Sequence, residues 1–237
     1  MVQTESVILG ELQVQVVRTQ RKKTLSVQVE QGQARILVPR TLPFAEIEAM
    51  VAKKARWIRL KLAEQQQTPP LPAKEYMNGE AFSYIGQNYR LQIVTNAPSG
   101  PAELDAGRLM VPMPTSSPSP DRIRAAVMKW YKAEAAEVLP ERVQRYERIM
   151  KVSATSVMVK QYKARWGSCY ADGRISFNWL IIMAPSTVID YVVVHELSHL
   201  VHMDHSPEFW RLVERYHPGY ANAQQWLQDH GAELHLL

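Results

Sequence analysis

The residues of this chain that could carry out chemistry lie near its C-terminal end. All seven histidines fall between positions 195 and 235 of the 237-residue sequence. In the run His195-Glu196-Leu197-Ser198-His199, two imidazoles stand four residues apart, slightly more than one helical turn, so both project from one helix face and can bind one metal ion. Glu196 would lie beside that ion without binding it. A carboxylate in that place can take a proton from metal-bound water.

The third ligand of such a site must come from a turn after the helix. His202 shares the helix face, but seven residues of straight helix rise by about 10 Å, too far for ligands that each lie about 2 Å from one ion. Ser206-Pro207 has the form of a cap followed by the first residue of a new helix, which places His205 at the turn. We therefore predict His205 as the third ligand, and His202 as a residue that lies behind the ligands, at the rim of the pocket or in solvent. Glu208 and Glu214 remain alternatives, because a carboxylate also binds zinc.

These ligands predict a zinc ion and a hydrolytic reaction. Three neutral imidazoles leave the charge of the ion largely uncompensated, which favours a lower pKa of the bound water. The expected reaction is peptide-bond hydrolysis, in which zinc polarises the carbonyl group while Glu196 deprotonates the attacking water and then passes the proton to the leaving amine. The sequence offers four candidates for an oxyanion-stabilising residue without singling one out: Arg165, His202, Tyr216 and Tyr220.

Several elements must form to position these residues. From Glu11 to Val38, apolar and polar residues alternate with a period near two, which predicts a small antiparallel meander. From Phe44 to about Gln66, apolar residues recur at steps of three and four, which predicts a helix. Basic residues flank this stripe at 53–61, either as a solvated face or as one that contacts phosphate or nucleic acid. The proline-rich run 68–72 ends the helix.

The rest of the chain carries signals for short strands and for helices. We expect strands at 82–85, 89–94 and 108–111, a Pro/Ser-rich separator at 112–120, a helix at 121–150 interrupted or kinked near Pro140, and a hairpin of 156–170 with 175–181. Ser186 or Thr187 should cap the helix of the two ligands, and Thr187 with Asp190 has the spacing of a capping box. We find no internal repeat. The sequence thus predicts an N-terminal β-rich region at 1–111, which contains the helix 44–66, and a second domain at 121–237.

Composition limits the class of protein. A single cysteine excludes an internal disulfide framework and a multi-cysteine zinc site. The net charge of +5 permits nucleic-acid binding without indicating it. No apolar run approaches the roughly 18 residues of a membrane helix, and the N-terminus lacks the pattern of a signal peptide. We therefore expect a soluble, cytoplasmic protein whose oligomeric state the sequence does not give.

Motifs around the histidines resemble those of a known family. They are Arg165-Trp166-Gly167-Ser168-Cys169, Ile175-Ser176-Phe177-Asn178-Trp179, the run 189–197, His205-Ser206 and Phe209-Trp210, with further matches at 21–23, 54–58 and 84–91. In these residues the chain resembles the YgjP-like metallopeptidases, relatives of the SprT and Wss-type proteases among the HExxH zincins. The matches extend over most of the chain and are far more specific than HExxH alone.

The resemblance implies an α+β fold. It implies a zincin-like metallopeptidase domain whose active-site helix lies under a small twisted sheet, together with an N-terminal β-rich region and a linking helix. It also implies zinc as the cofactor, with His195, His199 and His205 as its ligands. Metzincins carry a glycine three residues after the second histidine, where this chain has His202, so the chain departs from the metzincin pattern at this turn.

By analogy with other zincins, one strand would border the substrate. The strand at Trp166–Cys169 would edge the cleft and pair with an extended peptide, which makes Trp166, Gly167 and Ser168 candidate substrate contacts beside His202. A glycine at position 167 would allow close approach of another backbone or mark a bulge. Phe209 and Trp210 are expected in the core, and Cys169 either in the core or facing the cleft.

The leading prediction is a zinc metallopeptidase, a metal-dependent hydrolase that acts on a peptide or protein substrate. Two other classes stay open. A metal-dependent nucleotide pyrophosphatase would attack a phosphoanhydride, but the chain has no Gly-rich phosphate loop or carboxylate cluster for Mg²⁺. A DNA-associated protease of the SprT/Wss type would use the basic helix as its nucleic-acid face. A metal-stabilised binding module is disfavoured, because it would have no use for Glu196.

Overall fold

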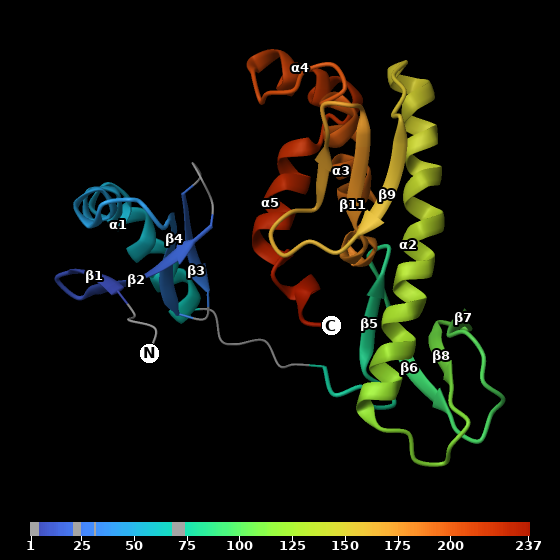
Figure 1. The fold of residues 1–237 in the computed structure, drawn as a ribbon. Coiled ribbons are helices and arrows are strands. Elements are labelled where there is room, and N and C mark those ends of the chain that lie inside the picture. The colour runs from blue at the N-terminus through green and yellow to red at the C-terminus, as the bar shows by residue number, and fades with distance from the viewer. Residues whose placement is uncertain (1–4, 21–24, 31, 68–73) are drawn as a thin grey trace. The chain divides into compact units, whose positions relative to one another are not determined.

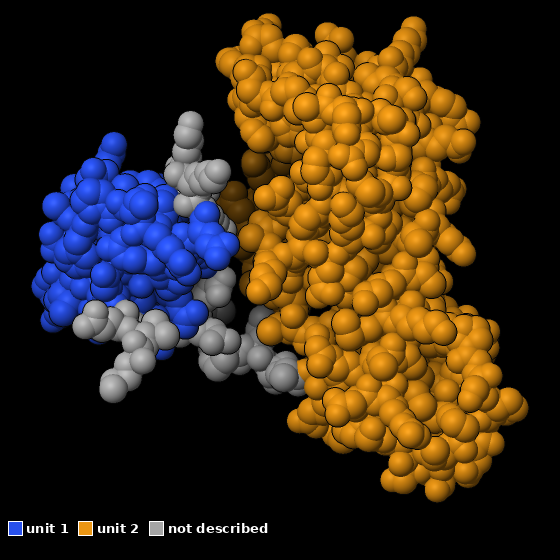
Figure 2. Space-filling model, viewed as in Figure 1, with its two compact units in different colours: residues 1–71 blue, residues 72–237 orange. Residues whose placement is uncertain are grey.

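Two compact units divide the chain at residues 71 and 72. The computed structural model describes residues 5–20, 25–30, 32–67 and 74–237. Its units are Met1–Leu71 and Pro72–Leu237, blue and orange in Figure 2. The described residues form three sheets and five α-helices, so the chain is a mixed α/β protein. Among these residues, every helix is too short or too polar to span a bilayer.

Unit 1 is a four-stranded sheet with a helix packed against it. The strands are β1 (Glu5–Leu9), β2 (Leu12–Thr19), β3 (Ser26–Glu30) and β4 (Gln33–Pro39), in the spatial order β1-β2-β4-β3 (Figure 1). Helix α1 (Phe44–Gln67) corresponds to the helix predicted at 44–66. Its Ile47, Val51 and Ile58 are buried in one core with Val14 and Ile36 of the strands.

The strands of unit 1 do not form the antiparallel meander that we predicted. β1 pairs antiparallel with β2, and β3 with β4, but β2 and β4 are parallel neighbours with Val16 opposite Ile36. β1 itself was not predicted. The alternation of apolar residues located the other strands, but it reports only which face of a strand is buried, not which strand lies alongside.

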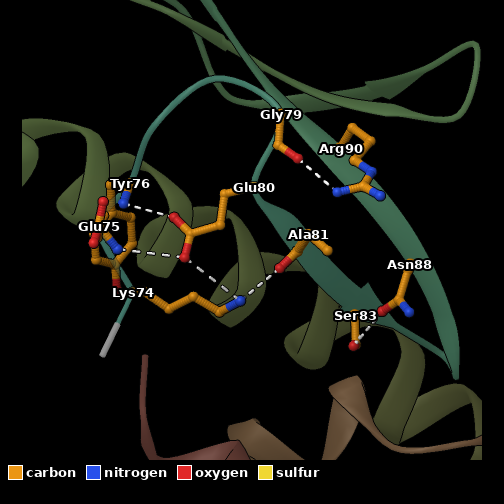
Figure 3. Close-up of polar contacts among 9 residues, drawn as sticks. All are labelled: Lys74, Glu75, Tyr76, Gly79, Glu80, Ala81, Ser83, Asn88 and Arg90. Atoms are coloured by element: carbon orange, nitrogen blue, oxygen red, sulfur yellow. Dashed lines mark hydrogen bonds and ion pairs between the residues drawn. The ribbon is translucent and has the colours of Figure 1, made fainter. Parts of the chain in front are cut away.

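Unit 2 begins with a polar cluster around Glu80 (Figure 3). The Glu80 carboxylate accepts hydrogen bonds from the backbone N–H groups of Glu75 at 3.3 Å and Tyr76 at 2.7 Å. Lys74 Nζ lies 3.7 Å from the same carboxylate and donates to the carbonyl of Ala81 at 2.7 Å. Because Ala81 is the first residue of strand β5 (Ala81–Tyr84), this cluster fixes where the first sheet of unit 2 starts.

The first sheet of unit 2 has the same topology as the sheet of unit 1. Its strands are β5, β6 (Gln87–Val94), β7 (Glu103–Asp105) and β8 (Arg108–Pro112), in the order β5-β6-β8-β7, and β7 was not predicted. In both sheets two antiparallel hairpins flank a parallel central pair, and a helix follows the fourth strand. Our prediction of no internal repeat is therefore wrong at the level of topology. The repetition lies in the strand pairing and the buried alternation, which a comparison of residue identities does not reveal.

Helix α2 (Pro120–Met150) is the longest element of unit 2. It continues through Pro140, so the interruption predicted there does not occur. Buried residues lie on both sides of the proline, Leu139 and Val143 among them. We attribute the continuity to the packing of this face against η1 (Trp179–Met183), the helix α3 (Ser186–Ser198) and β9 (Ser156–Lys160), which outweighs the hydrogen bond that a proline cannot donate.

A second sheet of unit 2 contains three strands. They are β9, β10 (Gly167–Cys169) and β11 (Arg174–Asn178), in the order β10-β11-β9. The predicted hairpin is formed by β10 and β11 alone, whereas β9 pairs parallel with the other side of β11. The residues after β11 form the 3₁₀ helix η1 instead of extending the strand. The prediction was wrong here because a short, fully buried apolar run has no periodicity that distinguishes a strand from a helix. β10 is consequently an edge strand, and it contacts α3.

Helices α3, α4 (Pro207–Tyr216) and α5 (Tyr220–His230) and the 3₁₀ helix η2 (Glu233–His235) complete the chain. The capping box predicted for α3 is wrong. Pro185 is the N-cap and makes no side-chain cap bond. Ser186 is already helical, and both it and Asp190 bind the guanidinium of Arg142 on α2. A charged donor makes stronger hydrogen bonds than the backbone N–H groups that the box would have satisfied.

One hydrophobic core runs through unit 2. Phe82, Leu91 and Leu109 of its first sheet are buried in the same cluster as Ile175 of β11 and Val193 of α3. The compact units thus divide at the proline-rich run, whereas the domain boundary predicted from sequence lies at 112–120. The limits 121–237 for the metallopeptidase domain stay a prediction.

Candidate metal and catalytic centre

Helix α3 ends within the predicted metal-binding motif. Its last residue is Ser198, and His199 is its C-cap. The chain then turns, and α4 begins at Pro207 with Ser206 Oγ accepting a hydrogen bond from the N–H of Phe209 at 3.5 Å. The predicted helix start at Ser206-Pro207 is confirmed, and the turn that the third ligand requires is present.

The three predicted histidines converge on one point. One ring nitrogen from each of His195, His199 and His205 lies within 4.8 Å of the other two. The Nε2 atoms of His195 and His205 are 3.2 Å apart. Nitrogens bound at about 2.1 Å to a tetrahedral ion stand on the order of 3.4 Å from one another, so this donor set has the spacing and the chemistry of a transition-metal site. Within the described residues, no other three His, Cys, Asp or Glu side chains are grouped in this way.

Hydrogen bonding orients two of the imidazole rings. Nδ1 of His199 donates to the backbone carbonyl of His202 at 3.0 Å, which leaves the lone pair of Nε2 for a metal ion. Nδ1 of His195 lies 3.5 Å from the hydroxyl of Tyr191. Sequence reasoning missed Tyr191, although a residue four positions before His195 shares its helix face.

Aromatic side chains of α4 pack against the ligand rings. Phe209 stacks on His199 with 4.5 Å between the ring centroids, and Trp210 stacks on His205 at 5.7 Å. Phe209 is fully buried, as expected of a core residue, whereas Trp210 is half-buried. These flat surfaces limit the rotation of the imidazoles.

The environment of the cluster favours neutral imidazoles. Burial, with a further contribution from His199 and His205, lowers the pKa of His195 to about 3. Burial also lowers the pKa of His199. Because an imidazolium cannot bind a metal ion, these shifts keep the nitrogen lone pairs available at neutral pH.

Glu196 is buried next to the histidine cluster, with 5% of its surface exposed. Burial raises the pKa of its carboxyl to about 8, against the smaller opposing effects of the Arg165 guanidinium and a backbone hydrogen bond of Cys169. A carboxyl group with a pKa near neutrality can both accept and release a proton.

Gly167 allows strand β10 to pass directly over Glu196. A Cβ atom added at Gly167 would lie 2.5 Å from Oε1 and 2.7 Å from Cδ of Glu196. Gly167 does not have a positive φ, so the need for glycine here is one of space. The close approach that we expected from another backbone is made by the carboxylate of Glu196.

A cavity of about 380 Å³ adjoins the histidine cluster and Glu196. Of the four predicted substrate contacts, Trp166 and Gly167 line it, whereas Ser168 and His202 do not. Helix α5 also contributes to the wall, which no sequence pattern indicated. Its lining residues are Gln224, Leu227 and Gln228.

The remaining candidates lie around this centre. Glu208, an alternative third ligand, binds an arginine of its own helix at 2.5 Å, and Glu214 is exposed. Of the four candidates for oxyanion stabilisation, Arg165 lines the cavity, and Tyr220 stacks on Trp210 at 5.4 Å.

Comparison with known proteins identifies the family. The family model of the YgjP-like metallopeptidase domain matches residues 23–230, so the chain belongs to this family and the resemblance seen in its motifs is confirmed. The crystal structure of the metallopeptidase zymogen abylysin of Pyrococcus abyssi is similar over 41% of this chain and 96% of that chain, with 22% sequence identity and a TM-score of 0.36. No curated protein matches the chain. Membership of the family implies a metal ion and a peptide or protein substrate.

Proposed function

We propose that this protein is a zinc-dependent metallopeptidase. The observation that carries the proposal is the convergence of three imidazoles beside one buried carboxylate, at His195, His199, His205 and Glu196. Family membership supports a metal-dependent peptidase. We propose zinc because three imidazoles match its preference for nitrogen ligands and leave a fourth position open for water or substrate.

In the proposed reaction, Glu196 handles the proton. A zinc ion held by the three histidines would supply a Lewis acid that polarises a carbonyl group and lowers the pKa of water. Glu196 accepts a proton from the attacking water and donates it to the leaving amine. Tyr191 and the backbone of His202 keep the ligand rings oriented, and Gly167 leaves the space in which the carboxylate lies.

The outer edge of strand β10 is evidence for a site that binds an extended peptide. The carbonyl of Trp166 accepts from the N–H of Asn178 at 2.8 Å, and the N–H of Tyr170 donates to the carbonyl of Arg174 at 2.9 Å. Peptide groups along an antiparallel pair alternate in direction, so those of Gly167 point away from β11 and are oriented to pair with a substrate strand. This orientation supports Gly167 as a substrate contact, and Trp166, Ser168 and His202 stay proposed contacts beside it.

We also propose a zincin-type arrangement for residues 121–237, in which the active-site helix α3 lies under the sheet of β9, β10 and β11. The contact between α3 and β10 supports this assignment. The N-terminal region at 1–111, including α1, would then be an addition to the catalytic part of the chain.

The experiment that tests the proposal compares wild type with Glu196→Gln. Glutamine keeps the size of the side chain but cannot accept the proton. We expect purified wild type to contain zinc and to cleave peptide or protein, and the variant to keep its zinc while losing about 10²- to 10⁴-fold in rate. Undiminished cleavage by the variant, or full activity of the zinc-free protein, would refute the proposal.

The same assay separates the alternative functions. The wild-type protein should not hydrolyse nucleoside triphosphates, and it should cleave peptides in the absence of DNA. Release of pyrophosphate without peptide cleavage would indicate a nucleotide pyrophosphatase. Cleavage only in the presence of DNA would indicate a DNA-associated protease.

A further inference from the structure

The cavity beside the proposed active site draws its walls from three parts of unit 2. Helix α3 contributes Val192, the segment before β10 contributes Arg165 and Trp166, and α5 contributes Gln224 and Gln228. At about 380 Å³ the cavity is ample for one long amino-acid side chain. Because His195 and Glu196 also line it, a group in this cavity would lie next to the reacting bond.

The C-terminal end of the chain packs against Trp166. The ring of His235 lies 5.2 Å from the ring of Trp166. A Cβ atom on Gly231, just after α5, would lie 3.1 Å from Cζ2 of the same tryptophan. This packing holds α5 close to β10, so the residues of α5 that face the cavity have fixed positions.

Arg165 provides an exposed positive charge in the wall. Its guanidinium donates to Ser168 Oγ at 3.4 Å and lies 5.6 Å from the ring centroid of Tyr162. Among the described residues no carboxylate lies within ion-pair distance of it, and its charge acts on Glu196 without a hydrogen bond. Most of its five N–H donors therefore remain available to a ligand.

Two amide side chains of α5 are also available. Gln224 and Gln228 make no side-chain hydrogen bond within the described part of the chain, although both line the cavity. Gln225, which does not line the cavity, donates to Asp229 at 2.9 Å on the same helix. Helix α5 therefore presents to the cavity the two amides that have no hydrogen-bond partner among the described residues, whereas the amide that has one, Gln225, lies outside the cavity.

We propose that this cavity selects the substrate side chain next to the scissile bond and prefers one that ends in a carboxylate or an amide, glutamate above all. The proposal rests on the peptidase function proposed above. The rings and methyl groups of Trp166 and Val192 fit the methylene groups of such a side chain, while Arg165, Gln224 and Gln228 donate hydrogen bonds to its oxygen atoms. A lysine side chain would bring its ammonium group against Arg165.

The test measures binding and cleavage separately. Fluorescently labelled peptides carry Glu, Gln, Leu or Lys at one position on either side of a cleavable bond. Their affinities are measured by fluorescence anisotropy with the zinc-loaded full chain carrying Glu196→Gln, and their initial rates with wild type. We expect the Glu peptide to bind at least about 10-fold more tightly than the Lys peptide, since a hydrogen bond to a charged group is worth that factor.

Variants of the wall identify the residues that cause the preference. Arg165→Glu, added to Glu196→Gln, should reverse the order of the Glu and Lys peptides. Gln224→Leu and Gln228→Leu should weaken the Glu and Gln peptides by about 3- to 10-fold and leave the Leu peptide unchanged. Gln225→Leu is the matched control on the same helix and should change none of the affinities. Thermal unfolding of each variant checks that it folds.

Three outcomes would overturn the proposal. The first is equal binding of the Glu and Lys peptides, including no binding of either. The second is an order of peptide affinities that Arg165→Glu does not change. The third is a loss of kcat in Arg165→Gln that is the same for every peptide, with the ratios of their KM values unchanged. The last would make Arg165 a stabiliser of the transition state. In a further outcome, wild type cleaves no peptide while the Glu peptide still binds more tightly than the Lys peptide and Arg165→Glu still reverses this order. That result would refute the proposed peptidase function and support the proposed selectivity of the cavity.

Discussion

At the scale of single residues, the proposed chemistry depends on where the Glu196 carboxylate can lie. β10 approaches it so closely that a methyl group on Gly167 would fall 2.5 Å from Oε1. Gly167→Ala should therefore displace the carboxylate while leaving the three histidines together. We expect kcat/KM for peptide cleavage to fall by about 10- to 100-fold, with an unchanged zinc content by elemental analysis.

Gly100→Ala is the matched control for this variant. A Cβ atom there would meet only Pro112 Cγ at 3.5 Å, an ordinary contact. Equal activities of the two alanine variants would mean that Glu196 accommodates the added methyl group, and the spatial role of Gly167 would be wrong.

Cys169 lies on the same strand and should be an unreactive thiol. Burial raises its pKa to about 11, with smaller contributions from Glu196 and Asp172. The thiolate is the reactive form, and a raised pKa reduces the thiolate fraction at every lower pH. At pH 8 the native protein should react with iodoacetamide on the order of 100-fold more slowly than the urea-unfolded chain, and its rate should rise about tenfold per pH unit toward pH 11.

Alkylation followed by mass spectrometry between pH 7 and pH 11 measures this directly, because the chain has one cysteine. The unfolded chain in urea serves as the reference, since its thiol is exposed to solvent. Native and unfolded protein that react equally fast at pH 8 would show that the thiol is not held in a buried environment.

At the scale of elements, two neighbours fix the beginning of α3. In the β5–β6 turn, the N–H of Ile85 donates to the carbonyl of Ile182 in η1 at 2.8 Å. On α2, Arg142 binds Ser186 Oγ at 3.0 Å and the carboxylate of Asp190. The segment that leads into α3 is thus tied to the first sheet through η1, and the first turn of α3 is tied to α2. Both bonds help to set the position of the last turn, which carries the histidine cluster.

The β5–β6 turn makes this connection testable through Gly86. Gly86 has a φ of 78°, and a Cβ atom on it would lie 2.8 Å from Cα of Pro185, the N-cap of α3. Gly79 has a φ of 87° but open space around it. Gly79→Ala should lower the free energy of unfolding by about 1–2 kcal/mol through backbone strain alone. Gly86→Ala should lower it by about 1–3 kcal/mol more, because Pro185 must move.

Urea unfolding of both variants and wild type at one temperature gives the two differences. Because Gly79→Ala carries the same backbone strain without the contact, it isolates the contribution of Pro185. Equal losses of stability would contradict the close contact between the turn and α3.

The elements that could be predicted are those that depend on local sequence. The four-residue spacing of His195 and His199 and the helix start at Ser206-Pro207 involve only neighbouring residues, and the helix, the turn and the approach of His205 lie where they were expected. Most strands were located for the same reason, since alternation is a local pattern.

Features that depend on distant segments could not be predicted in this way. The parallel pairs β2–β4 and β9–β11 form between segments that are not consecutive strands of a hairpin. Arg142 replaces the predicted capping box only because α2 packs beside α3. Gln224 reaches the cavity because α5 packs against α3, which lies far from it in the sequence. None of these contacts leaves a periodic signal in the sequence.

At the scale of the whole molecule, the net charge and the candidate site belong to different units. Residues 1–71 contain 11 Lys and Arg and 6 Asp and Glu, whereas residues 72–237 contain 17 of each class. All of the candidate ligands and substrate contacts lie in the second, neutral unit. The basic residues at 53–61 therefore belong to unit 1, which contributes none of the candidate ligands or substrate contacts.

This division leads to a prediction about fragments of the chain. Unit 2 contains the complete histidine cluster and one continuous core, so the fragment 72–237 should fold cooperatively and bind zinc with the stoichiometry of the full chain. The fragment 121–237, which follows the boundary predicted from sequence, should not fold. It lacks Phe82, Leu91, Leu109 and Val111, which are buried in the same core as α2 and η1.

These four side chains bury apolar surface that the fragment 121–237 would have to leave exposed to water. Each contributes about 1.5–3 kcal/mol, so their joint loss is comparable to the whole stability of a domain, about 5–15 kcal/mol. Circular dichroism, thermal unfolding and zinc content of both fragments, measured beside the full chain, decide the question. A 121–237 fragment that unfolds cooperatively and binds zinc would make the first sheet of unit 2 an addition to a self-sufficient catalytic domain. Failure of that fragment, with a stable 72–237, would make the β5–β8 sheet part of the catalytic fold.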